Sequence, residues 1–256
     1  MTDTVISTEL SEEDLPRGAA AIFGPTLNAM FAPTKAFEVI AQRPVLACWP
    51  VLWVTALMVM LGAMNFEITR LVMRVGMIEA MAQRGQDVDA DQIRTVIETM
   101  DRWAPVTVLG LNVFIILSVG AFAALIWMGA SLMGGSTQFS RSFAVASVAS
   151  VVHPLLATAF VTLVWRVDPP QIRRVADFMQ STPSLGLALL LDSVELSPAM
   201  AQVVAHVDVF NLWWMVVVVI GSERLLRLKR GAATMLAVTL WILSTALVGL
   251  WTNLGS

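Results

Sequence analysis

Five long apolar stretches constrain this chain more than any other feature. They cover residues 45–64, 105–130, 143–165, 207–221 and 232–251. A helix needs about 20 apolar residues to cross a bilayer, and in lipid only helices and closed barrels satisfy their backbone hydrogen bonds. Charged residues make up 14% of the chain, against about 25% in soluble domains. The pattern predicts an all-α, polytopic transmembrane bundle of five spans.

Charge and motif content exclude several functional classes. The net charge of −3 gives no broad basic surface, so we expect no nucleic-acid partner. The single cysteine, Cys48, cannot form an intrachain disulfide or supply a thiolate metal cluster. The sequence also lacks HExxH, GxSxG and Walker motifs and a histidine pair at ligand spacing. We therefore expect no enzyme, with no catalytic, metal-binding or cofactor-binding residues.

The orientation of the spans follows from a short basic loop. Residues 1–26 are acidic and polar, and we expect a flexible segment without the apolar core of a signal peptide. The loop between the last two spans holds Arg224, Arg227, Lys229 and Arg230. Short basic loops face the cytoplasm, so we expect a cytoplasmic amino terminus and an outside carboxyl-terminal tail at residues 252–256. These four side chains are a candidate surface for lipid headgroups or a partner.

A short amphipathic helix is expected before the first span, in "FAPTKAFEVIAQRP". Pro33 suits the first turn of a helix. Phe37 and Ile40 share one face, and Lys35 and Glu38 share the opposite one. The pattern is typical of a helix lying in the membrane interface.

Residues 65–103 are too polar to cross the membrane, and their apolar spacing predicts an extracytoplasmic helical hairpin. Its turn resembles a calcium-binding loop, since Asp87, Asp89, Asp91 and Glu98 match positions one, three, five and twelve. Position six, where a glycine makes the sharp turn, is Gln92. We favour a helix start capped by Asp89 over calcium binding.

His153 and Pro154 are the most unusual pair inside a span. An ionisable residue at that depth is a candidate functional site, and Pro154 cannot donate a hydrogen bond to the Ser150 carbonyl. That carbonyl could instead accept the imidazole N–H, which would make the pair structural. The sequence leaves both readings open, with Ser150, His153 and Pro154 as a candidate polar site, and favours the structural one.

Small residues line the same span. Ser142, Ala146, Ala149 and Ser150 recur at helical spacing, and Gly120 with Ala124 offers a similar pair on the second span. Small residues let membrane helices approach closely. This spacing predicts helix packing and motivates the hypothesis that the chain forms a homo-oligomer or binds another membrane protein.

Three segments together resemble Yip1-domain membrane proteins. They are "FAPTKAFEVIAQRPVLACWPVLW", "GGSTQFSRSFAVASVASVVHPLLA" and "VFNLWWMVVVVIGSERLLRLKRGAATMLAVTLWI". The resemblance makes residues 27–251 a Yip1-like domain and implies five spans with a cytoplasmic amino terminus. The short amino-terminal region and large outside hairpin are typical of bacterial members, so we expect a bacterial inner membrane.

Eukaryotic members of that family are associated with Rab GTPases, vesicle traffic and membrane shaping, whereas bacteria lack that machinery. Rab binding is therefore not carried over to this chain. Our leading hypothesis is a non-enzymatic scaffold or adaptor in membrane organisation or a trafficking-like process, in contact with the lipid bilayer. The alternative is a transporter or channel component for a small molecule, ion or lipid, in which the His153–Pro154 break lines a polar cavity.

Overall fold

The computed structural model describes residues 18–83, 90–173, 183, 185–187, 200, 204 and 206–254. Its elements are α1 (Ala19–Phe31), α2 (Pro33–Gln42), the 3₁₀ turn η1 (Pro44–Ala47), α3 (Cys48–Met64), α4 (Phe66–Gln83), α5 (Ala90–Leu132), α6 (Phe139–Ser150), the π-helical turn η2 (Val151–Leu156), α7 (Ala157–Val167), α10 (Val209–Leu226) and α11 (Arg230–Leu254). Within the described residues, the exception to this all-helical fold is an isolated bridge between Gly186 and Asp208.

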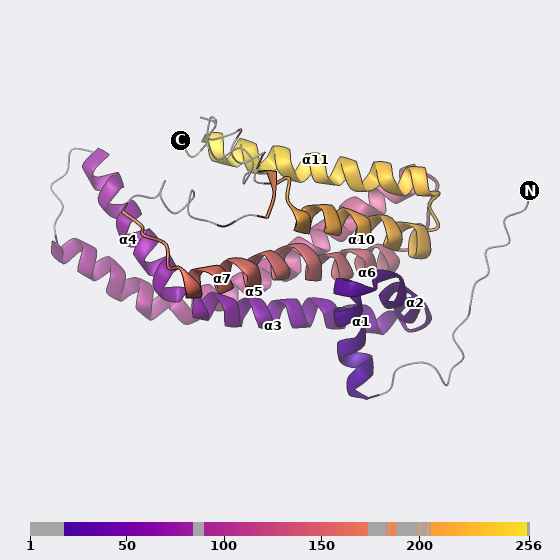
Figure 1. Ribbon diagram of the computed structural model, residues 1–256, viewed down its shortest axis with the longest axis horizontal. Helices are drawn as coiled ribbons and strands as arrows, with labels where there is room; N and C mark the ends of the chain where they lie inside the picture. Colours follow the sequence, from indigo (N-terminus) through magenta and orange to yellow (C-terminus); the bar gives the residue numbers. More distant parts are fainter. Residues whose placement is uncertain are drawn as a thin grey trace, which may run out of the picture.

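Five helical segments are long and apolar enough to cross a membrane, as the sequence predicted. They are Pro44–Met64, Val113–Leu132, Phe139–Val167, Val209–Leu226 and Arg230–Leu247. Figure 1 shows these helices side by side in an elongated bundle, with α1 and α2 near the end where α10 stops and α11 begins. At this end residues 133–138 connect α5 to α6, and residues 227–229 connect α10 to α11. We call it the basic end, because the second connection contains Arg227 and Lys229.

The third span is the centre of the bundle. It is formed by α6, η2 and α7, and 56% of its apolar stretch is buried inside the protein, against 22% for Val113–Leu132. α6 packs against α2, α3, α5 and α10, and its small side chains are buried from Ala144 to Ser150. Since lipid supplies no hydrophobic drive between helices, close van der Waals packing of this kind holds a membrane bundle together.

The amino-terminal region differs from the prediction. α1 begins at Ala19, inside the segment of residues 1–26 for which we expected a flexible chain. The sequence of α1, AAAIFGPTLNAMF, has no charged residue, and its contacts with α2 and α3 stabilise a helix in spite of Pro25. Residues 1–17 lie outside the described residues.

The amphipathic helix forms as α2, with Pro33 at its start. Its apolar residues Ala36, Phe37, Val39 and Ile40 are buried, and α2 packs on α6 and α10. Protein, rather than lipid, therefore covers the apolar face that we expected to lie in the membrane interface.

The predicted hairpin forms from α4 and the first part of α5, at the opposite end of the bundle from the basic end (Figure 1). α5 continues from the hairpin into the second span without interruption. Its 43 residues extend for ~65 Å at 1.5 Å per residue, about twice the hydrocarbon thickness of a bilayer. The amino-terminal part of α5 therefore projects beyond the bundle.

Candidate functional site

The His153–Pro154 pair lies in a π-helical turn and not at a simple proline kink. η2 widens the helix over Val151–Leu156, and the N–H of Ala157 is directed to the carbonyls of both His153 and Pro154. Proline removes a backbone donor, and a π turn lets the helix continue with shifted hydrogen bonds. Such turns occur frequently at functional sites.

The expected hydrogen bond from His153 to the Ser150 carbonyl is absent among the described residues. The Ser150 hydroxyl donates instead to the Ser147 carbonyl at 2.7 Å, and the Ser147 hydroxyl donates to the carbonyl of Ala47 in η1. Ser147 therefore ties the third span to the start of the first one, and the bond of Ser150 stays within its own helix. The half-buried imidazole of His153 therefore does not make the hydrogen bond to the Ser150 carbonyl that the sequence suggested.

Two titratable groups far away in the sequence interact electrostatically with His153. They are Asp208 and His206, at the start of α10. Asp208 caps that helix, because its Oδ1 accepts the N–H of Asn211 at 2.7 Å and its Oδ2 accepts from Asn211 Nδ2 at 3.0 Å. The sequence placed Asp208 only at the end of a span. α10 has only 18 residues and packs against η2, which brings its start toward the middle of the third span.

At the basic end, the four candidate headgroup residues do not have equal surroundings. Arg224 lies 3.8 Å from Glu38 of α2, and Arg230 lies 4.0 Å from Glu223. Arg227 and Lys229 are exposed and have no acidic partner within the part of the chain that the structure describes. These two side chains are the cations most available to an outside ligand.

The turn that carries Arg227 is fixed by hydrogen bonds to the end of α10. The N–H of Leu228 donates to the Ser222 carbonyl at 3.2 Å, and the N–H of Ser136 donates to the Leu226 carbonyl at 2.8 Å. A guanidinium nitrogen of Arg141 donates to the Leu225 carbonyl at 3.2 Å. Carbonyls at a helix end need such donors, so the two connecting turns at the basic end form one rigid unit.

Arg227 itself adopts a left-handed backbone conformation with φ of 59°. This region costs an L-residue roughly 1–2 kcal/mol, and glycine is its usual occupant. Nothing in the sequence of the loop signals such a conformation.

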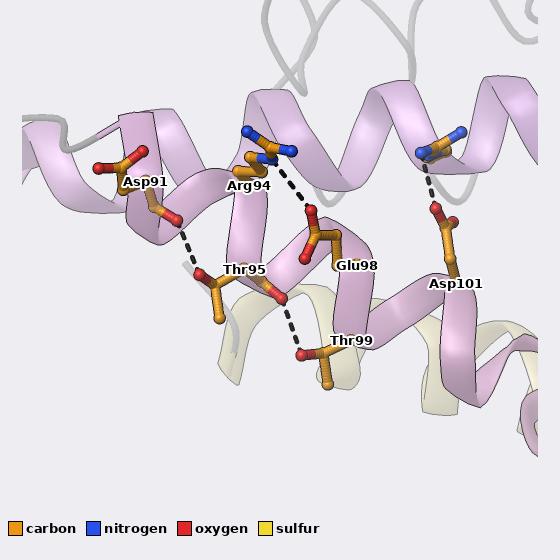
Figure 2. A network of polar contacts seen from close by, with 7 residues as sticks. Asp91, Arg94, Thr95, Glu98, Thr99 and Asp101 are labelled. Atoms are coloured by element: carbon orange, nitrogen blue, oxygen red, sulfur yellow. Dashed lines mark hydrogen bonds and ion pairs between the residues drawn. The ribbon is translucent and has the colours of Figure 1, made fainter.

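The acidic loop of the hairpin does not present a calcium site in its described part. Figure 2 shows Glu98 turned toward Arg94, and their side chains form an ion pair at 3.0 Å. Asp101 likewise pairs with Arg70 of α4 at 2.7 Å. Asp87 and Asp89, with the cap predicted at Asp89, lie outside the described residues. No cluster of metal-binding side chains occurs among those that are described.

The small residues of the third span pack within one copy of the chain. Ser142, Ala146 and Ala149 are almost completely buried, so they no longer support self-association. Gly120 is not a packing contact, because a Cβ there would meet nothing within 4 Å. Close approaches between helices occur at Gly129, against Leu236 of α11, and at Gly221, against Phe37 of α2, and the small-residue spacing identified neither of them.

A family model described as Yip1 domain matches residues 27–252. No curated protein and no solved structure matches the chain.

Proposed function

The chain belongs to the Yip1-domain family, and from that premise we propose that this multi-pass membrane protein is a non-enzymatic scaffold or adaptor in membrane organisation. The proposal assigns contact with anionic lipid headgroups to the basic end. It includes a cytoplasmic location for that end, and for the amino terminus, in a bacterial inner membrane. The support for this orientation is the loop with Arg224, Arg227, Lys229 and Arg230, because short basic loops face the cytoplasm.

The observation that carries the proposal is the conformation of Arg227. This exposed arginine stands in a left-handed position that glycine would occupy without strain. Strained residues persist where the surrounding structure holds them, and they concentrate at functional sites. A side chain held outward at that cost, next to exposed Lys229, is well suited to bind phosphate groups.

The expected affinity comes from charge more than from shape. A basic residue near an anionic membrane surface contributes about 1 kcal/mol. Arg224 and Arg230 already lie near Glu38 and Glu223, so most of the attraction comes from Arg227 and Lys229. The hydrogen-bonded turn keeps the backbone of both residues in place, so binding has to order only their side chains.

Native mass spectrometry of the protein from phosphatidylglycerol nanodiscs tests this assignment. We expect Lys229→Gln and Arg227→Gly to retain less phosphatidylglycerol than the unaltered protein, whereas Arg227→Lys retains it. Arg94→Gln, at an exposed arginine of the hairpin, is the control and should have no effect. Arg227→Gly should also be more stable by about 1 kcal/mol, because glycine relieves the left-handed strain.

Equal lipid retention by all four variants would rule out the headgroup assignment. If lipid retention is equal but a photo-crosslinker at position 229 captures a protein in native membranes, the basic end contacts a protein partner instead.

A transporter or channel component is the second candidate function. The observation in its favour is the π turn that holds His153, with Asp208 and His206 in electrostatic range. On this view, His153→Ala abolishes a pH-dependent proton flux, followed with a pH-sensitive dye in reconstituted vesicles, while the protein stays folded. A scaffold gives the same low flux with and without the substitution.

A further inference from the structure

α1 carries an exposed apolar stripe that the functions proposed above do not use. Phe23, Leu27 and Phe31 are 43%, 55% and 83% exposed, and their spacing of four places them on one face of the helix. Pro25 and Ala29, on the other side, are buried. α1 also lacks any charged residue, which is unusual for a helix on an aqueous surface.

The contacts of α1 place it at the depth of the membrane spans. The ring of Phe23 stacks on that of Trp53, with 4.5 Å between their centroids. Trp53 lies inside the span that starts at Pro44, ~15 Å along it at about 2.0 Å per residue in the 3₁₀ turn η1 and 1.5 Å per residue in α3. α1 therefore lies below the start of the first span and not on top of the bundle.

A second contact agrees with this depth. α1 packs against η2, which begins at Val151. The charged residue nearest to the basic end of that span is Arg141, and Val151 lies ~15 Å further along the helix. Since the hydrocarbon core is about 30 Å thick, η2 begins near its middle.

The direction of α1 shows how it would lie in a bilayer. In Figure 1, α1 runs across the direction of the spans, so its axis lies along the membrane plane. A helix satisfies its own backbone hydrogen bonds, which allows it to stay within hydrocarbon without spanning it.

The first span, which α1 contacts, also exposes apolar side chains. Val45, Leu52 and Met60 of η1 and α3 are 74%, 50% and 50% exposed, as expected for side chains that face acyl chains. We propose that α1 is embedded in the leaflet at the basic end, where Phe23, Leu27 and Phe31 contact lipid acyl chains. The chain thus holds an in-plane helix in one leaflet in addition to its five spans.

Spin-label accessibility tests this placement. Nitroxide labels are attached at Leu27→Cys and Phe31→Cys in a Cys48→Ser background, because the native Cys48 is exposed. Leu243→Cys, exposed on the α11 span, reports the lipid environment, and Arg94→Cys, at an exposed position of the hairpin, reports water. The full-length protein is reconstituted into vesicles of phosphatidylcholine and phosphatidylglycerol, and collisions with oxygen and with a nickel chelate are measured by electron paramagnetic resonance.

We expect the labels at positions 27 and 31 to resemble the one at 243, with high oxygen accessibility and nickel accessibility several-fold below that at 94. Nickel accessibility equal to that at 94 would place α1 in water and overturn the proposal. Low accessibility to both reagents would mean that protein covers the stripe. Dipolar broadening that disappears on dilution with unlabelled protein would then identify a second copy, and its absence would identify another segment of the same chain.

Both labelled side chains are mostly exposed, so their replacement leaves the packing of α1 intact. Phe23 is not replaced because it stacks on Trp53. A monodisperse elution profile equal to that of the unlabelled protein confirms that each variant is folded before its accessibility is interpreted.

Discussion

Gly221 is the position where a single added methyl group tests the packing of the bundle. A Cβ at this position would lie 2.6 Å from Cζ of Phe37 and 3.0 Å from Cγ1 of Val145. Carbon atoms in contact normally stay 3.5–4.0 Å apart, so the Phe37 ring would have to retreat by about 1 Å. The ring is fully buried between α2, α6 and α10, and it has little room to do so.

The expected cost of Gly221→Ala has two opposing parts. Overpacking a tight site costs about 1–3 kcal/mol, whereas alanine is favoured over glycine inside a helix by about 0.8–1.0 kcal/mol. Gly62→Ala provides the matched control, because Gly62 also lies inside a helix and a Cβ there meets nothing within 4 Å. The difference between the two variants cancels the helix propensity and isolates the packing cost, which we expect to be about 1–3 kcal/mol.

Reversible unfolding in mixed micelles of dodecyl maltoside and SDS gives the free energy of each variant. Gly62→Ala should be neutral or stabilising, and Gly221→Ala should be destabilised relative to it. Phe37→Leu removes the atom nearest to the new methyl group and leaves a cavity when made alone. The double variant, Phe37→Leu with Gly221→Ala, should therefore lose less stability than the sum of the two single variants.

Two results would refute this reasoning. If Gly221→Ala unfolds like Gly62→Ala, α2 does not lie against α10 as closely as the structure has it. If the effects at positions 37 and 221 are additive, the two residues are not in contact.

Three further predictions use the same unfolding assay. Asp208→Ala should cost about 0.5–2 kcal/mol because α10 loses its cap, while Asp208→Asn keeps most of the stability; equal losses would argue against capping. Thr162→Val should cost about 1–3 kcal/mol, because it leaves the buried Asn65 Nδ2 without the Thr162 hydroxyl that accepts its hydrogen bond at 2.6 Å. Asn65→Leu removes the polar group itself and should cost less. A larger loss of stability for Asn65→Leu than for Thr162→Val would exclude this hydrogen bond. Arg70→Met should cost only about 0.2–1 kcal/mol, because its partly exposed pair with Asp101 is screened, and the loss should shrink in high salt. A salt-independent loss would show that attraction between these charges does not stabilise the hairpin.

Hydropathy and periodicity predicted the elements whose signals are local. Each apolar stretch became a span, and the apolar spacing after residue 65 became α4 and the start of α5. α1 was missed because the Gly24-Pro25 pair argues against a helix in a local reading. Its formation depends on contacts with α2 and α3 that no local pattern records.

The candidate sites likewise have some features that the sequence revealed and others that only the structure revealed. The basic loop could be found from its residue types, and so could the unusual His153–Pro154 pair. The left-handed conformation of Arg227 could not, since nothing in its neighbours requires it. The electrostatic interaction of His153 with Asp208 was also out of reach, because it depends on where α10 starts relative to η2.

The sequence by itself determined that this chain has five membrane spans, a basic connecting loop and a polar helical hairpin in series. Partition into a bilayer is a sum of transfer free energies over about 20 consecutive residues, so it can be read from the chain alone. Only the tertiary structure decided that α2 is covered by protein, that Gly221 rather than Gly120 is a point of close approach, and that α1 lies beside Trp53. Those outcomes depend on how helices distant in sequence cross and on which side chains then meet, and such packing is a property of the whole bundle.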